Sequence, residues 1–209
     1  MKRGQGAFIT VEGTDGSGKT TQVKLMEKYL EEKGYEAVLT REPGGTEISE
    51  KIRSIILEPD NREMGAVAEM LLYASARAQL VHEVIRPALD EGKIVICDRF
   101  VDSSYVYQGF GRGLDLKIIT DINRVALDGV APEITFFFDL SPVIALKRRL
   151  DSGKADRIEK EEMEFHMRVY SGYRKLAMLY PERIKAVNGN RSVEEIFEDV
   201  KCWIDIILG

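Results

Sequence analysis

A short apolar run that leads directly into a glycine-rich turn constrains this chain more than any other feature. Residues 8–11 are apolar or β-branched, and after Glu12 the turn reads Gly13-Thr14-Asp15-Gly16-Ser17-Gly18-Lys19-Thr20, which matches G-x-x-x-x-G-K-[ST] in full. Glycines permit the positive φ angles that let backbone N–H groups converge on an anion. A helix that begins near the lysine adds the positive end of its dipole. Residues 13–21, including Thr21, are therefore the predicted ATP-binding residues.

Two further positions complete a predicted magnesium–nucleotide site. In such a loop the ammonium of Lys19 reaches the β and γ phosphates, and the hydroxyl of Thr20 binds Mg²⁺. Asp98 ends the apolar run 93–98, where a carboxylate can hold Mg²⁺ directly or through water. Arg99 follows at once and suits bidentate phosphate contact. An apolar run that ends in aspartate is common, so the glycine-rich loop carries most of this interpretation.

Strand-like and helix-like segments alternate along the 209 residues. Such alternation predicts a single α/β domain over residues 1–209, with a parallel sheet covered by helices on both faces. Pro87 is expected to bend or divide the longest helix. Strands are predicted at 6–13, 36–40, 93–98, 133–140 and 183–189. Helices are predicted at 19–34, 46–57, 65–92, 115–129, 141–151, 159–181 and 192–208.

Composition limits the partners and the compartment. The formal net charge is −5, which argues against long-range attraction to nucleic acid or to an anionic membrane. The N-terminal apolar run is too short for a signal sequence or a membrane span. The two cysteines, Cys97 and Cys202, form no CxxC pair and no evident disulfide framework. We therefore expect a cytoplasmic protein without nucleic-acid or membrane partners.

Four segments resemble the thymidylate kinase (dTMP kinase) family, from near the N-terminus to the C-terminus. They read EGTDGSGKTTQ (12–22), TREPGGTEISEKIR (40–53), LLYASARAQLVHEVIRPAL (71–89) and CDRFVDSSYVYQGFGRG (97–113). The resemblance implies ATP-dependent phosphorylation of dTMP to dTDP on a P-loop NTPase fold. It also implies a five-stranded parallel sheet of order 2-3-1-4-5, a small lid and a homodimer.

The resemblance further implies which residues hold the phosphates and the base. Arg77 would bind the dTMP phosphate, because a guanidinium suits a phosphate dianion. Arg99 and Arg41 would align the donor and acceptor phosphates, and Pro43 would shape the wall beside the base. For Arg77, the alternative is an ordinary salt bridge on a helix surface.

Another five residues would recognise the nucleoside. Tyr73 resembles the aromatic residue that stacks on thymine, although core packing is its alternative role. Ser104 and Gln108 would contact the edge of the base. Tyr107 would crowd the sugar 2′ position and favour deoxyribose, and Asp15 would lie near the 3′-hydroxyl.

The catalytic positive charge is expected to come from a lid at about residues 148–160. Some family members carry an arginine in the loop where this chain has Gly16, so the resemblance is to the bacterial type, in which the lid supplies the charge. The lid offers several basic residues, and an ordinary solvated turn is its alternative interpretation. The predicted catalytic residues are Lys19, Arg99, Arg149, Lys154 and Arg157; Arg148 is also available.

Two other functions remain open at this stage. One keeps the enzyme class but changes the acceptor to another nucleoside monophosphate or to a deoxynucleoside. The other is a regulatory P-loop NTPase, although the N-K-x-D guanine motif is absent from the sequence. For a kinase, the acceptor phosphate is already ionised at neutral pH, so alignment and charge stabilisation replace a general base.

Overall fold

The computed structural model describes residues 6–150 and 156–209, and for residues 149 and 150 it describes only the backbone. Five parallel strands form its central sheet in the order β2-β3-β1-β4-β5. They are β1 (Ala7–Glu12), β2 (Ala37–Arg41), β3 (Ile94–Asp98), β4 (Ile134–Asp139) and β5 (Ile184–Asn188). The predicted α/β class, the five strands and their order are confirmed.

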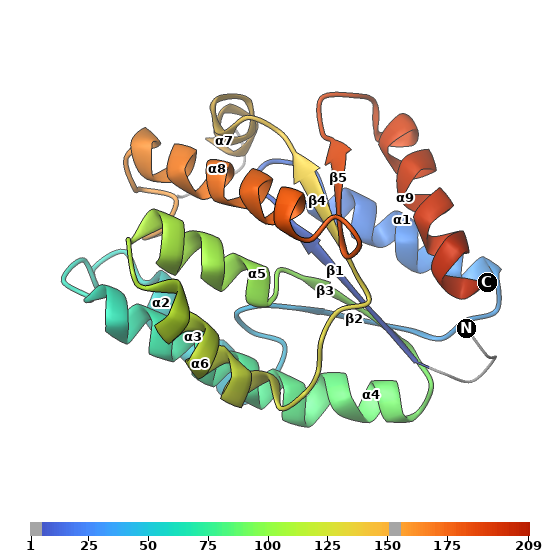
Figure 1. Cartoon of the computed structure of the whole chain (residues 1–209), viewed down its shortest axis with the longest axis horizontal. Coiled ribbons are helices and arrows are strands. Elements are labelled where there is room, and N and C mark those ends of the chain that lie inside the picture. The colour runs from blue at the N-terminus through green and yellow to red at the C-terminus, as the bar shows by residue number, and fades with distance from the viewer. Residues whose placement is uncertain (1–5, 151–155) are drawn as a thin grey trace.

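Helices cover both faces of this sheet (Figure 1). One face carries α1 (Lys19–Glu32) and α9 (Val193–Leu208). The other face is covered by helices that lie between β2 and β5 in the chain. These are α2 (Glu47–Leu57), α3 (Ala66–Leu80), η1 (Val81–Ile85), α4 (Arg86–Asp90), α5 (Val101–Ser104), η2 (Tyr105–Gly111), α6 (Leu116–Leu127) and α8 (Met163–Leu179). Helix α7 (Pro142–Leu150) follows β4.

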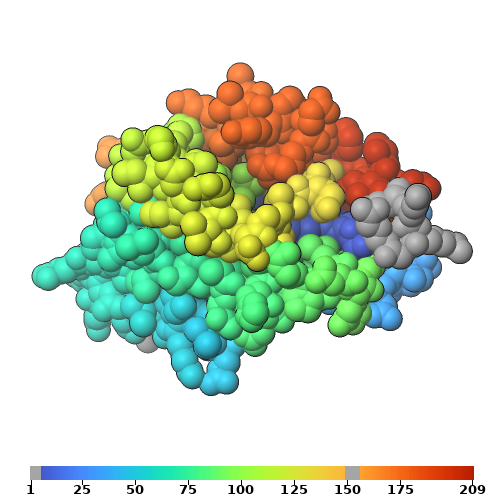
Figure 2. Space-filling view, turned by 60° about the horizontal axis from the view of Figure 1, so that its bottom comes forward, coloured from blue at the N-terminus to red at the C-terminus, as the bar shows by residue number. Residues whose placement is uncertain are grey.

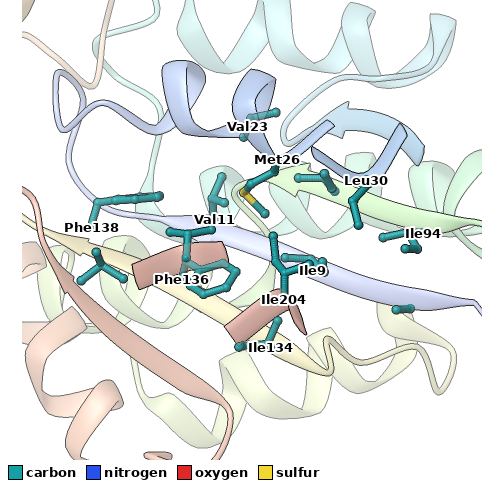
Figure 3. Close-up of a cluster of buried hydrophobic side chains, with 14 of the residues drawn as sticks. Ile9, Val11, Val23, Met26, Leu30, Ile94, Ile134, Phe136, Phe138 and Ile204 are labelled. Carbon is teal, nitrogen blue, oxygen red and sulfur yellow. The ribbon is translucent and has the colours of Figure 1, made fainter. Parts of the chain in front are cut away.

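The core beneath α1 and α9 explains why the central strands are apolar throughout. Ile9 and Val11 of β1 face Met26 of α1 and Ile204 of α9 (Figure 3). Because side chains alternate along a strand, Phe8 points to the opposite face, where it joins the cluster under α3 and α4. All six residues of β1 are buried, as expected for a parallel strand covered on both faces.

A third cluster places α8 over β4 and β5. Tyr173 of α8 stacks on Phe137 of β4, with ring centroids 5.1 Å apart and an interplanar angle of 16°. Phe165 and Val169 of the same helix pack against Tyr107 of η2. The result is an aromatic layer directly behind the carboxyl ends of the strands, where the glycine-rich loop also lies.

The helix starts predicted from capping residues are found in the structure. Ser192 and Glu195 form the predicted capping box at the start of α9. Helix α7 begins at Pro142, as predicted from Ser141 and the proline at the first helical position. The long helix predicted at 65–92 is divided: a π-helical stretch at Val81–Ile85 precedes Pro87, which has no N–H to donate and lies in the first turn of α4.

One helical segment was not predicted. Residues 101–111 form α5 and the π-helical η2, although their aromatic and β-branched side chains favour a strand. The start of α5 is capped by a carboxylate from elsewhere in the chain. Glu12 accepts hydrogen bonds from the backbone N–H groups of Phe100 at 2.8 Å and Ser103 at 3.2 Å. Because this cap lies about 90 positions away, local patterns do not reveal it.

Candidate active site

The glycine-rich loop joins β1 to α1 in the conformation that its sequence requires. Gly13, Gly16 and Gly18 have φ angles of 141°, 84° and 96°, which residues with a Cβ rarely adopt. The Nζ of Lys19 donates to the carbonyl oxygens of Gly13 at 3.0 Å and Thr14 at 3.1 Å. Burial lowers the pKa of Lys19, and the nearby Arg99 lowers it further.

A cavity of about 390 Å³ opens in front of this loop, and we call it the phosphate cavity. Six of the predicted ATP-binding residues line it: Asp15, Gly16, Gly18, Lys19, Thr20 and Thr21. The other three, Gly13, Thr14 and Ser17, are buried within the loop behind it. Arg41, Asp98 and Arg148 complete its walls from β2, β3 and α7. Five residues with cationic side chains thus line this cavity, which suits it to phosphate: Lys19, Arg41, Arg53, Arg99 and Arg148.

A second cavity of about 210 Å³ adjoins the first, and we call it the acceptor cavity. Pro43, Tyr73, Tyr107 and Gln108 line it, as the predicted nucleoside site requires. Burial raises the pKa values of Tyr73 and Tyr107, so both rings present neutral phenols at neutral pH. Four residues line both cavities and mark their junction: Asp15, Glu42, Arg53 and Arg99.

Arg99 is held rigidly at this junction. Its φ of 69° is a left-handed conformation that non-glycine residues seldom adopt, which turns the side chain back over the loop. Its Nη2 donates to Asp15 at 2.7 Å, and its Nη1 donates to the Tyr173 hydroxyl at 3.1 Å. The guanidinium lies 5.3 Å from the centre of the Tyr107 ring. The nearby Asp15 raises the pKa of Arg99, despite its burial, so its charge is permanent.

Arg53 also lies at the junction, and sequence reasoning missed it. It stands on α2, and its Nη1 donates to the carbonyl oxygen of Pro43 at 2.8 Å. Arg53 is the last residue of segment 40–53, which resembles the thymidylate kinase family, and this position is the sequence signal that could have identified it. Arg41, predicted to align phosphates, is exposed and paired with Glu50 at 2.8 Å, and lines the phosphate cavity only.

Arg77 differs from the prediction. Its side chain is 1% exposed, and all five of its N–H donors have protein partners. The Nε and Nη2 atoms donate to Glu42 at 2.9 and 2.6 Å, and Nη1 donates to Ser104 at 2.9 Å and to Asn123. Arg77 lines only the acceptor cavity, so this arrangement does not favour a contact between Arg77 and the acceptor phosphate.

Ser104 is likewise corrected. It is 2% exposed, does not line the acceptor cavity, and its hydroxyl accepts from Arg77. The neighbouring Ser103 lines the cavity instead, because the helical turn directs residues 103 and 104 to different sides of the segment. Ser104 therefore supports Arg77 from behind rather than facing the cavity.

The residues predicted to bind metal fit a divalent cation in part. Thr20 and Asp98 line the same cavity, and the Oδ1 atom of Asp98 is buried without a hydrogen-bond partner. Residues 6–150 and 156–209 contain no group of three or more His, Cys, Asp or Glu side chains that could hold a metal alone. Mg²⁺ commonly takes few protein ligands and completes its shell with phosphate oxygens and water. The donor set therefore fits Mg²⁺ bound together with a nucleotide.

Comparison with known proteins shows the family to which this chain belongs. The model of the family described as thymidylate kinase matches residues 11–200. The chain belongs to the thymidylate kinase family. It is 51% identical over 195 residues to the thymidylate kinase of Exiguobacterium sp. strain AT1b, covering 93% of this chain and 92% of that protein. It is 50% identical over 201 residues to that of Symbiobacterium thermophilum, covering 96% and 94%.

A solved structure agrees with the family assignment. The crystal structure of thymidylate kinase from Ehrlichia chaffeensis superposes with a TM-score of 0.79 at 34% sequence identity. The superposition covers 96% of this chain and 99% of that one. Since likeness at this level extends over the whole sheet and its helices, the P-loop NTPase fold predicted from the sequence is confirmed.

In this thymidylate kinase family member, α7 closes over the glycine-rich loop. A Cβ atom built on Gly16 would lie 2.0 Å from the carbonyl oxygen of Ala145, and the φ of Gly16 is positive. An arginine at position 16 therefore has no room in this arrangement. Arg148, near the end of α7, lines the phosphate cavity instead. This contact explains why position 16 does not supply a positive charge, and supply from the lid stays a prediction.

The lid residues named from the sequence fare unequally. Lys154 lies outside the described residues, as does the side chain of Arg149. Arg157 does not line either cavity: it is 7% exposed and donates to Glu69 of α3 at 2.6 Å and to the carbonyl oxygen of Ile56 at 2.7 Å. Arg157 is thus not placed for catalysis, because its guanidinium holds this end of the lid against α2 and α3. Among the described basic side chains of the lid, that of Arg148 lines the phosphate cavity.

The segment held by Arg157 forms part of the acceptor cavity. Asp156, Ile158 and Glu159 all line it. Burial raises the pKa of Asp156.

In the part of the chain that the structure describes, no helix is long and apolar enough to cross a membrane.

Proposed function

We propose that this chain transfers the γ-phosphoryl group of ATP to dTMP, forming dTDP and ADP. Family membership supports this reaction, and the junction of the two cavities is the observation that carries it. A phosphate cradle built on the glycine-rich loop opens, through Asp15, Glu42, Arg53 and Arg99, into a cavity lined by two tyrosines. Donor and acceptor phosphates meet at this junction, as in-line transfer requires.

The chain's own residues supply alignment and charge stabilisation. Arg53 and Arg99 stand between the donor and acceptor phosphates and reduce their mutual repulsion. Lys19 and Arg148 stabilise negative charge that spreads over the transferring group. No residue is needed as a general base, because the acceptor phosphate is already ionised. Arg149 and Lys154 remain predicted contributors from the lid.

The acceptor cavity supports selection of a deoxynucleoside monophosphate. Tyr73 offers a stacking face for the base, and Tyr107, packed under Arg99, restricts the sugar. Gln108 forms a polar part of the acceptor-cavity wall that is not shared with the phosphate cavity, and it suits the edge of the base. Asp15 lies at the junction, where a sugar hydroxyl is within its reach. These assignments make Arg77 a support of the cavity wall and give the acceptor phosphate to Arg53 and Arg99.

Mg²⁺ is the proposed cofactor, held by Thr20 and Asp98 together with the nucleotide. When bound, it would neutralise phosphate charge during transfer. We place the reaction in the cytoplasm, where a reducing environment suits a chain whose two cysteines are both free thiols. We also propose that residues 1–209 form a single nucleoside monophosphate kinase domain with its lid at about 148–160.

A homodimer is the proposed assembly, and one surface supports it. Apolar residues are exposed at helical spacing on α2, α3 and α6, which pack side by side in that order. Figure 2 shows α6 (yellow) beside the teal segment that contains α3. The exposed apolar residues are Ile48, Ile55, Val67, Leu71, Ile118 and Val125. Sedimentation equilibrium should give twice the mass of the chain; a monomer at all concentrations would contradict this assembly.

An acceptor panel tests the reaction. With ATP and Mg²⁺, we expect kcat/KM for dTMP to exceed that for dUMP by about tenfold or more. The two differ by one methyl group, and the loss of one such group from a fitted pocket costs about that factor. We expect smaller values still for dCMP and AMP, and none for thymidine, which lacks the acceptor phosphate. ADP formation and product identity measure this directly. Equal rates with thymidine, or ATP hydrolysis with no transfer to any acceptor, would overturn the proposed function and favour one of the two alternatives.

Replacing Arg148 by alanine tests the lid assignment. We expect kcat for dTMP phosphorylation to fall by about 10²-fold. We expect a smaller change in KM for dTMP, because Arg148 lines the phosphate cavity and not the acceptor cavity. Steady-state kinetics measure both quantities. Lys147→Ala is the matched control, since Lys147 is an exposed neighbour that does not line the cavity. Equal losses in the two variants would contradict a specific role for Arg148.

A further inference from the structure

Glu42 has one carboxylate oxygen fully used and one left bare. Its Oε2 accepts two hydrogen bonds from Arg77, at 2.9 and 2.6 Å. Its Oε1 is buried and has no hydrogen-bond partner, although Glu42 as a whole is only 4% exposed. A buried oxygen without a partner costs about 1–3 kcal/mol. The bare Oε1 therefore indicates a partner that arrives with a ligand.

The position of Glu42 narrows what this ligand is. Glu42 lines both cavities at their junction. It directly follows β2, and its backbone N–H donates to the carbonyl oxygen of Asp98 at 2.9 Å, at the end of the neighbouring strand β3. Asp98 also carries a buried carboxylate oxygen without a partner, Oδ1. Two residues joined through their backbones thus each carry one buried, unpartnered carboxylate oxygen, and both line the phosphate cavity.

Phosphate oxygens cannot satisfy an ionised carboxylate, because they are acceptors and carry the same sign of charge. A hydrated divalent cation can satisfy both. Mg²⁺ usually keeps several of its water ligands, and each of these waters donates hydrogen bonds. Groups that accept from metal-bound ligands orient the first coordination shell and raise metal affinity.

We propose that Glu42 belongs to the divalent-cation site, accepting through Oε1 from a water ligand of the cation that Asp98 and Thr20 hold. The proposal rests on the proposed function, since that reaction brings the metal–nucleotide to this cavity. Arg77 acts as the clamp: by donating twice to Oε2, it fixes the carboxylate in one orientation and leaves Oε1 available to the water ligand. Glu42 thereby links the back of the acceptor cavity to the metal.

Glu42→Gln tests this role, because glutamine has nearly the same shape and keeps a carbonyl oxygen for Arg77. The readout is the affinity of Mn²⁺ for the protein with a non-hydrolysable ATP analogue, from the electron paramagnetic resonance signal of free Mn²⁺. We expect the Mn²⁺ affinity to fall by about tenfold. We expect the affinity for dTMP, measured calorimetrically without metal, to fall by less than the Mn²⁺ affinity, although Glu42 also lines the acceptor cavity. Glu47→Gln is the matched control, an exposed carboxylate of α2 paired with Lys51 outside both cavities.

Two results would overturn the proposal. One is an unchanged Mn²⁺ affinity in Glu42→Gln. The other is weaker metal-free dTMP binding with normal Mn²⁺ binding, which would mean that Oε1 accepts from the acceptor nucleotide. If the variant does not fold, crystals of the unaltered chain with Mn²⁺ and the analogue answer the question. A metal-bound water against Oε1 supports the proposal, and its absence refutes it. None of these measurements uses the acceptor reaction, so a failed acceptor panel would reject the proposed function separately.

Discussion

Lys19→Met is expected to lower kcat for dTMP phosphorylation by about 10³-fold, because it removes the positive charge nearest to the transferring group. The Lys19 residue is 6% exposed, and its Nζ atom lies within the loop, 3.0 Å from the carbonyl oxygen of Gly13. Burial already lowers its pKa, so this ammonium is poorly solvated and interacts strongly with phosphate oxygens that enter the cavity. Methionine has a similar length and no charge.

Single-turnover kinetics with saturating ATP and dTMP measure this loss, and thermal unfolding checks the fold. We expect the unfolding midpoint to change little, since methionine fills much of the same space. Lys24→Met provides the control, because Lys24 is exposed on the same helix and does not line the phosphate cavity. Near-normal turnover in Lys19→Met would mean that the loop does not hold the donor phosphates.

Glu69→Ala should lower the free energy of unfolding by about 3–5 kcal/mol, the range for removing one partner from a buried ion pair. Glu69 of α3 is fully buried and accepts from Gln108 at 3.0 Å, Arg112 at 3.0 Å and Arg157 at 2.6 Å. Its loss leaves Arg157, 7% exposed, with a buried charge and no carboxylate. Urea denaturation measures the change. A loss below about 1 kcal/mol would show that the cluster relaxes or takes up water.

The same carboxylate predicts an acid dependence of stability. Burial raises the pKa of Glu69, but the hydrogen bonds from Arg112, Gln108 and Arg157 outweigh this and lower it below the ordinary value of 4.5. A lowered pKa in the folded state means that the stabilisation is present above pH 4.5 and is lost as the pH falls below it. The stability gap between the unaltered chain and Glu69→Gln should therefore narrow below that pH. Glu63→Gln, at an exposed position, should show no such narrowing.

Much of the fold follows from local patterns. The short apolar runs predicted all five strands. Ser192 with Glu195 and Ser141 with Pro142 marked the starts of α9 and α7, because caps depend on residues within one turn. Residues 101–111 escaped prediction because their helix is capped by Glu12 from β1.

The candidate site divides in the same way. The loop motif by itself determined the phosphate cradle, since positive φ angles, a lysine and a helix start are properties of consecutive residues. The tertiary structure alone decided the partners of the arginines. Arg77 binds the carboxylate of Glu42, which is 35 positions away in the sequence. Arg157 binds that of Glu69, which is 88 positions away. A guanidinium binds phosphate or carboxylate equally well, so its role depends on which anion the packing of strands and helices brings to it.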